Sequence, residues 1–143
     1  MSAVAHKDKI AQVKVIATED IFSRILNEME DRHINMDMIN FFTEKKAFAL
    51  DVSNLEEVEN ILKQYDVEYE IKPDCAKVTL IGNKVTETPG VIAKIMRALN
   101  AENVTLLQSS DSYNSLSCLV DEKDMVTTVH VIQIGRASCR ERV

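Results

Sequence analysis

Two kinds of hydrophobic spacing alternate along this chain, and they return in the same order after 70 residues. From Ile21 to Met29 the apolar positions fall at i, i+1, i+4, i+5 and i+8, the spacing of a helix with one apolar stripe. From Ile34 onward the pattern changes to the alternation of a half-buried strand. Residues 91–110 repeat this succession and align with residues 21–40 without a gap. The pattern therefore predicts two copies of one structural unit.

The apolar stripes of the two predicted helices occupy equivalent positions. The pairs are Ile21 and Val91, Phe22 and Ile92, Ile25 and Ile95, Leu26 and Met96, and Met29 and Leu99. In the first copy, strand patterns cover 11–16, 35–42, 46–52 and 67–72, and a second helix pattern covers 54–65. In the second copy, strand patterns cover 76–81, 106–111 and 116–121, and a second helix pattern covers 122–132. We expect Asn54 to cap its helix, with Glu57 completing a capping box.

The order β-α-β-β-α-β predicts an α+β fold of two ferredoxin-like modules, each an antiparallel sheet with helices packed on one face. The second copy lacks a fourth strand pattern before residue 134, whereas residues 2–7 form an unpaired strand pattern at the N-terminus. We therefore expect a first module at 10–74, nested inside a second module made of 3–9 and 75–133. In that arrangement neither module folds independently.

Composition and charge narrow the class of function. The chain has 143 residues, a formal net charge of −6, and no apolar run near the roughly 20 residues that cross a bilayer. The acidic balance disfavours nucleic acids and anionic membranes as partners. The N-terminus lacks the apolar core of a signal peptide, so a cytoplasmic protein is expected. The three cysteines fit no metal-ligand spacing and no disulfide framework, and Cys118 is expected to fill the core.

The last ten residues, 134–143, differ in composition from the rest of the chain. They hold three arginines, whereas residues 1–133 contain only Arg24, Arg32 and Arg97. A nucleotide string that encodes them resembles a common sequencing-library adapter, so we expect a non-native tail; a genuine basic C-terminus is the alternative. Without this segment 14 basic and 22 acidic residues remain, which gives a net charge of −8.

Turn residues gather before the first helix pattern of the second copy. The chain has only three glycines and two prolines, yet Gly82, Pro89 and Gly90 fall within nine positions. Proline presets a helical φ, and glycine lets another group approach the unpaired N–H groups of the first turn. Such a backbone corner, at the positive end of the helix dipole, suits a carboxylate. The alternative is an ordinary helix start with Thr88 as its N-cap.

These residues carry a family resemblance. KVTLIGNKVTETPGVIAKIMRAL, followed by NVTLLQSSDSYNSLSCLVDEKDM, resembles the second ACT module of aspartate kinases, and VAHKDKIAQVKV with HINMDMI resembles the first. ACT modules are amino-acid sensors, so the resemblance implies nested modules, a homodimer, and feedback inhibition by lysine, threonine or meso-diaminopimelate. It places catalysis, with ATP and magnesium, in a separate kinase domain whose Lys-Phe-Gly-Gly-Thr motif is absent here. By itself the chain is expected to be neither an enzyme nor a cofactor-binding protein.

The resemblance also assigns effector-binding positions, which fall at the first helix start and at the second strand of each module. They are Asp20, Ile21, Asn35, Met36 and Asp37 in the first module, and Thr88, Pro89, Gly90, Val91, Thr105, Leu106 and Gln108 in the second. An effector is expected between a helix start and the second strand of a partner module. Asp37 is the residue expected to hold its ammonium group; an exposed strand acid without that role is the alternative.

The first module departs from the family pattern. Its helix start, ATEDIFSRI, lacks the Pro-Gly element and has a shortened loop, although Asp20 can still cap the helix. This puts lysine and threonine in doubt as ligands and leaves meso-diaminopimelate open.

Two other classes of function stand beside amino-acid sensing. A ligand-free module that only holds kinase subunits together would carry the same repeat. An independent enzyme is disfavoured, because His6, His33 and His130 are scattered and the sequence shows no paired carboxylates, no nucleophile beside a base and no phosphate-binding glycine loop. The sequence leaves open which amino acid is sensed, whether both modules bind it, and whether the chain is a natural regulatory subunit or part of a truncated gene.

Overall fold

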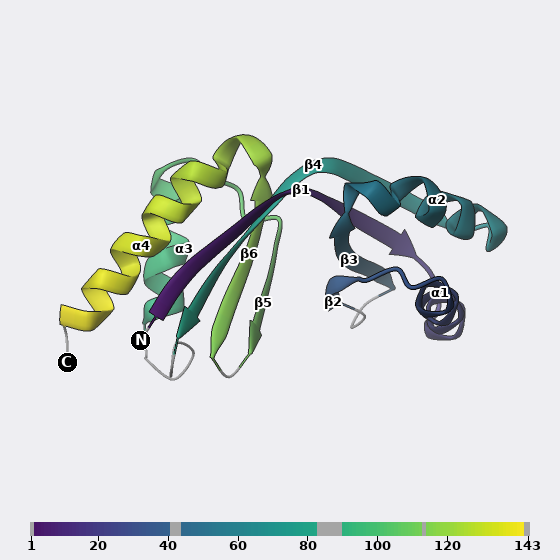
Figure 1. Ribbon diagram of the computed structural model, residues 1–143, viewed down its shortest axis with the longest axis horizontal. Helices are drawn as coiled ribbons and strands as arrows, with labels where there is room; N and C mark the ends of the chain where they lie inside the picture. The colour runs from purple at the N-terminus through teal and green to yellow at the C-terminus, as the bar shows by residue number, and fades with distance from the viewer. Residues whose placement is uncertain (1, 41–43, 83–89, 113, 142–143) are drawn as a thin grey trace. The chain divides into compact units, whose positions relative to one another are not determined.

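The computed structural model describes residues 2–40, 44–82, 90–112 and 114–141 (Figure 1). The chain divides into two compact units. We call Lys9–Asp74 the first module, and Met1–Asp8 together with Cys75–Val143 the second module. Each module therefore contains part of the two long strands, β1 and β4.

The first module is a four-stranded sheet with two helices. Its strand order is β2-β3-β1-β4, and β3 runs antiparallel to both of its neighbours. Its elements in chain order are β1 (Ser2–Ile16), α1 (Glu19–Asp31), β2 (Asp37–Asn40), β3 (Lys45–Asp51), a 3-10 turn (Val52–Asn54), α2 (Leu55–Gln64) and β4 (Glu68–Gly82).

The second module has the same architecture. Its strand order is β1-β4-β6-β5, and β6 runs antiparallel to β4 and β5. Its further elements are α3 (Val91–Ala101), β5 (Gln108–Ser112), β6 (Ser115–Asp121), a 3-10 turn (Glu122–Asp124) and α4 (Met125–Glu141). The predicted α+β fold of antiparallel sheets and packed helices is confirmed (Figure 1).

The two long strands differ from the sequence prediction. Four separate strand patterns, at 2–7, 11–16, 67–72 and 76–81, form two continuous strands of 15 residues each. The apolar alternation is interrupted near residues 8 and 74, where each strand leaves one core and enters the other. At this point of β1, Lys9 has a φ of 57°, a conformation that residues other than glycine seldom adopt. Because the hydrophobic pattern breaks where the strand passes from one core to the other, the sequence predicted the end of a strand at that point.

The 70-residue repeat is present in the structure. Ile16 of β1 lies opposite Lys45 of β3, and Ile81 of β4 lies opposite Ser115 of β6. Equivalent residues are thus 65 positions apart before the first helix and 70 positions apart after it. The connection from strand to helix is five residues longer in the second module, in agreement with the shortened first-module loop expected from the sequence.

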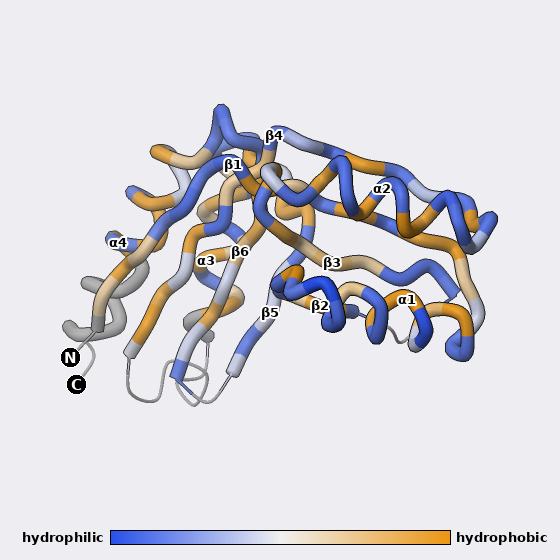
Figure 2. Tube along the Cα trace, turned by 45° about the vertical axis from the view of Figure 1, so that its right-hand side comes forward, coloured by the Kyte–Doolittle hydropathy of each residue, from blue (hydrophilic) through white to orange (hydrophobic). Residues whose placement is uncertain are grey.

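Each module has its own apolar core. In the first module, Phe22 of α1 packs beside Phe48 of β3, with their ring centroids 6.2 Å apart. The predicted stripe of α1 is confirmed, because Phe22, Ile25 and Met29 are buried and its two other members pack against them. Along both helices of this module the hydrophobic and hydrophilic residues alternate as an amphipathic helix requires (Figure 2).

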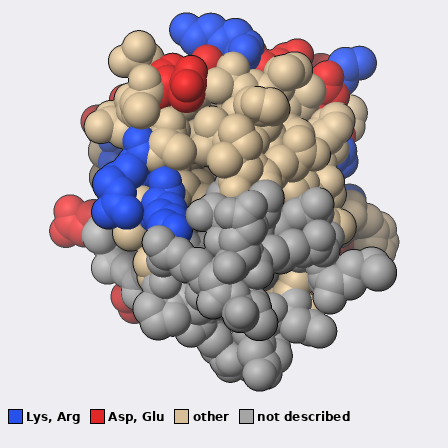
Figure 3. Space-filling model, turned by 90° about the vertical axis from the view of Figure 1, so that its left-hand side faces the viewer, with Lys and Arg blue, Asp and Glu red and all other residues tan. Residues whose placement is uncertain are grey.

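In the second module the predicted stripe is only partly buried. Ile95 and Leu99 of α3 lie in the core, but Ile92 and Met96 are 38% and 47% exposed. The position equivalent to Phe48 is Cys118, which offers a smaller side chain for α3 to cover. Figure 3 views the molecule from the side on which α4 lies in Figure 1. The upper centre of its described surface is largely uncharged, and a group of basic side chains lies to the left of it.

The predicted capping box of α2 is wrong. Asn54 is the N-cap residue of α2, as predicted, but its side chain makes no cap hydrogen bond. A 3-10 turn leads directly into the helix, so Asn54 already has a helical conformation. The side-chain cap belongs to the 3-10 turn, where the Asp51 carboxylate accepts the N–H two residues later at 2.9 Å. Asp121 makes the equivalent bond in the second module at 3.0 Å.

Helix α4 passes the boundary at which the sequence suggested a non-native tail. Its backbone is helical through Glu141. Val131 and Ile132 are buried in the second core, whereas Ile134 is 58% exposed. Among the side chains that the structure describes, Ile132 is the last core residue of this helix.

Candidate functional site

The helix start of the second module is an exposed backbone corner. Gly90 is the N-cap of α3, with φ of 84° and ψ of −8°, and its carbonyl accepts the N–H of Lys94 at 2.9 Å. A Cβ at this position would meet no atom within 4 Å, so the positive φ, rather than crowding, favours glycine here. The alternative of Thr88 as N-cap is wrong, because Gly90 holds that position. Thr88 and Pro89 lie outside the described residues, and for Val91 the structure describes only the backbone start of α3.

The helix start of the first module is closed by its own side chains. The Thr18 hydroxyl accepts the N–H of Ile21 at 3.3 Å, so Thr18, and not Asp20, caps α1. Asp20 lies in the first turn and forms an exposed ion pair with Arg24 at 3.3 Å. Glu19 adds a second acid to the same turn. Two carboxylates and a capped N–H group make this terminus a poorer anion site than the one at Gly90.

The second-strand candidates of the first module lie at a strained edge. Asp37 is the first residue of β2, and its carboxylate accepts the N–H of Met38 at 2.8 Å. Met38 has a φ of 53°, and the register with β3 shifts between Asp37 and Asn40, as in a β-bulge. Asn35 and Asp37 are exposed and Met36 is half-buried. Backbone strain of this kind is frequent at binding sites.

The equivalent segment of the second module is regular. The backbone N–H of Leu107 donates to the carbonyl of Leu119 at 2.8 Å, and β5 continues in register with β6. Thr105 is exposed, Leu106 packs against the second core, and Gln108 is half-buried at the start of β5. Of the two modules, the first carries the distorted second strand.

No single module brings its two groups of candidates together. Helix α1 separates the residues near Thr18 from those near Asp37, and its 13 residues extend about 20 Å. The pairing agrees, because Ile16 lies opposite Lys45 at one end of β3 whereas Asp37 lies opposite Ala49 near the other. In the second module, α3 separates Gly90 from β5 in the same way. A ligand that contacts both a helix start and a second strand therefore needs two modules.

The structure adds a groove that the sequence did not predict. It lies in the first module and has a volume of about 660 Å³, within the range of small-molecule sites, about 300–1,000 Å³. Its walls are the end of β1, the first turn of α1, the start of β3, and the turn between α2 and β4. Of the predicted site residues, Ile21 lines it. Lys46 also lines it and is only 3% exposed. The sequence offered one indication of this groove, because Lys46 occupies the position at which the second copy of the repeat has Leu116.

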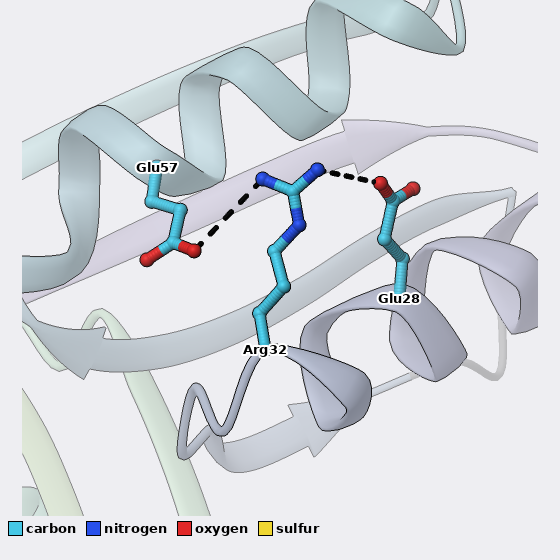
Figure 4. A network of polar contacts seen from close by, with 3 residues as sticks. All are labelled: Glu28, Arg32 and Glu57. Atoms are coloured by element: carbon cyan, nitrogen blue, oxygen red, sulfur yellow. Dashed lines mark hydrogen bonds and ion pairs between the residues drawn. The ribbon is translucent and has the colours of Figure 1, made fainter.

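A polar network ties the helices of the first module together beside this groove. Arg32, the C-cap residue of α1, reaches Glu28 of that helix at 2.9 Å and Glu57 of α2 at 3.9 Å (Figure 4). Tyr65, which lines the groove, donates a hydrogen bond to Glu28, and this bond, with partial desolvation, raises the pKa of the Tyr65 hydroxyl. The network holds the turn after α2 against α1.

Comparison with known proteins identifies a family that this chain resembles in sequence. Residues 70–133 match the family described as the ACT domain. This part of the chain is an ACT domain. The chain is 27% identical over 135 residues to aspartokinase 1 of Bacillus subtilis, an alignment that covers 92% of this chain and 33% of that protein. The chain thus spans about a third of the length of the curated relatives it matches.

Solved structures show the same fold. The ligand-free regulatory subunit of aspartate kinase from Thermus thermophilus matches with a TM-score of 0.83 and 21% identity, covering 93% of this chain and 97% of that one. Aspartokinase III of Escherichia coli, in complex with lysine and aspartate, matches with a TM-score of 0.70 and 18% identity, covering 96% of this chain and 32% of that one. The arrangement of elements in both modules is therefore that of aspartate kinase regulatory regions.

Other features of the described residues carry less information. No helix among them has the length and apolar character that crossing a membrane requires. Within the same ranges, no three His, Cys, Asp or Glu side chains are grouped as metal ligands would be.

The cysteines of the ACT domain are expected to be unreactive in the native protein. Cys75 and Cys118 are buried, and desolvation raises the pKa of the Cys118 thiol to about 11. At pH 8 only about a thousandth of such a thiol is thiolate, the reactive form, against roughly a quarter for an ordinary cysteine. In a Cys139→Ser variant, we expect a thiol reagent to label the folded protein at least about a hundred times more slowly than the urea-unfolded one. Equal rates would show that the second core is open.

Proposed function

We propose that this chain is the amino-acid-sensing regulatory region of an aspartate kinase, and that it mediates feedback inhibition by an end product of the pathway. The observation that carries the proposal is the coincidence of two matches over nearly the whole chain. One is sequence similarity to an aspartokinase over 92% of the chain, and the other is fold similarity over 97% of a regulatory subunit of aspartate kinase. Both cover the two modules together.

The proposed role is allosteric and not catalytic. Phosphate transfer, with its ATP and magnesium, belongs to the kinase domain of the parent enzyme, and this chain needs no cofactor. Binding of the effector shifts the enzyme toward an inhibited state to the extent that the two states differ in affinity. A solved relative, Escherichia coli aspartokinase III, binds lysine, which supports an amino acid as the effector here.

The proposed effector site is shared between modules of a homodimer. The helix-start residues and the second-strand residues lie at opposite ends of each module, about 20 Å apart in the first. A second copy of the chain can bring Asp37 to a helix start that its own module cannot reach. Lysine, threonine and meso-diaminopimelate are the effectors to test, each with an ammonium group for Asp37 and a carboxylate for the helix-start side.

Calorimetry on the intact chain tests the proposal. We expect one of the three amino acids to bind, and Asp37→Asn to weaken that binding at least about tenfold, because a hydrogen bond to a charged group is lost, about 1.5–3 kcal/mol. Asp111→Asn, which changes an exposed acid on β5, is the matched control and should leave the affinity unchanged. A folded dimer that releases no heat with any of the three, and whose light scattering ignores them, would instead be a ligand-free assembly module.

A further inference from the structure

Lys46 is a charged residue in a core position. It lies on β3 opposite Val15, two residues before the buried Phe48, and is only 3% exposed. The repeat supplies an internal comparison, because the equivalent position of the second module is Leu116, which is 4% exposed and belongs to the second core. The same fold therefore accepts a leucine at this position and has a buried ammonium group only in the first module.

In the groove the positive charge of Lys46 is buried, and the negative charges lie at the solvent-exposed rim. Lys46 is the only base among the described residues that line the 660 Å³ groove. The acids that line it are all exposed to solvent: Glu19, Glu44, Asp66 and Glu68. An inner cation with outer carboxylates is complementary to a ligand with an inner carboxylate and outer ammonium groups, which describes a free α-amino acid.

Fold stability does not account for a lysine here. Burial of an ammonium group costs free energy that a leucine at the same position avoids. An ammonium also has three N–H donors, so a protein partner for Lys46 does not exhaust its capacity to bind a ligand. The nearby helix start is the one that lacks a Pro-Gly corner and is capped by Thr18. A side-chain cation is therefore needed if an anion is to bind at this end of the first module.

We propose that Lys46 anchors the effector's α-carboxylate in the first-module groove, and that the second module, with Leu116, has no equivalent anchor. This inference rests on the proposed function and specifies which module binds and through which residue. The ammonium groups of the effector face the acids at the rim, where a second chain can add Asp37. Lys46 thus supplies, with a side chain, an anion site that the capped helix start of the first module does not offer.

The test couples a change in the protein to a change in the ligand. Calorimetry on the intact chain compares lysine, threonine and meso-diaminopimelate with lysinamide, threoninamide and the diamide of meso-diaminopimelate, in which a neutral amide replaces each carboxylate. For the amino acid that binds, we expect the wild-type chain to prefer the acid over its amide at least tenfold. Lys46→Met should weaken binding of the acid at least tenfold. The variant should then bind the acid and its amide with equal affinity. Lys46→Arg should keep the preference for the acid, and Leu116→Met is the control that should change nothing.

The outcomes separate the inference from the function on which it rests. Binding of an amino acid by the wild type, together with an unchanged acid preference in Lys46→Met, would overturn the inference and leave the sensing function intact. Absence of binding of all three amino acids to the wild type would reject both. If Lys46→Met does not fold, equal affinity of the wild type for acid and amide would still overturn the inference.

Discussion

Replacement of Leu116 by lysine is expected to destabilise the second module by about 4 kcal/mol or more. Leu116 is 4% exposed and packs in the second core with Val78 and Ile95. Loss of a buried leucine side chain costs about 2–5 kcal/mol, and burial of an ammonium group adds to that. Because a domain is typically stable by only about 5–15 kcal/mol, the variant should be largely unfolded at modest urea concentration.

The reciprocal change should have the opposite sign. Lys46→Leu gives the first module the residue that the second already has, and it is expected to be neutral or to raise the free energy of unfolding by about 1 kcal/mol. Urea unfolding followed by circular dichroism measures both variants. If Lys46→Leu instead costs several kcal/mol, the ammonium group holds the first module together, and its role is structural. A gain in stability combined with a loss of effector binding would mark a residue kept for function.

The fold could be predicted from the sequence because each hydrophobic pattern occurs in both copies of the repeat, so that one copy supports the interpretation of the other. The stripe from Ile21 to Met29 would be an ordinary amphipathic helix in isolation. Its recurrence 70 residues later, with the same change to strand alternation, made the element order secure. The long strands were cut in two because the apolar alternation stops where one core gives way to the other, although the backbone pairing does not. Hydrophobic periodicity records burial and not hydrogen bonding.

The caps and the groove could not be predicted from the sequence for a different reason. Asn54 holds the N-cap position of α2, but its side chain makes no cap bond, and the Asp51 carboxylate caps the preceding 3-10 turn instead. Asp20 could cap α1 by residue type, but Thr18, two residues earlier, does so. Such choices depend on where the helical conformation begins, which sequence reading places only to within a few residues. Lys46 was visible as a break in an apolar strand, yet only the structure shows that it remains buried and lines a groove.

Deletion of residues 2–8 is expected to destabilise the second module by several kcal/mol while the first keeps its own core. These residues are the part of β1 that belongs to the second module, and Val4 packs against the second core. Their removal leaves the second-module part of β4 without its β1 neighbour, which exposes backbone groups and the apolar side chains of that edge. The first module retains Lys9–Asp74 and hence all four of its strands.

Hydrogen exchange and thiol labelling measure the two modules separately. Amides of β4 after Cys75 should exchange faster, and Cys118 should become accessible, whereas amides of α1 and β3 keep most of their protection. Truncation after Gln133 is the matched control at the other terminus. It should change stability by less than about 0.5 kcal/mol, because Ile134 is exposed and the preceding Ile132 remains. If deletion of residues 2–8 left exchange in β4 unchanged, the N-terminal segment would not complete the second module, and the nested arrangement would be wrong. If protection were lost equally in both modules, the nesting would stand and the two cores would unfold as one cooperative unit.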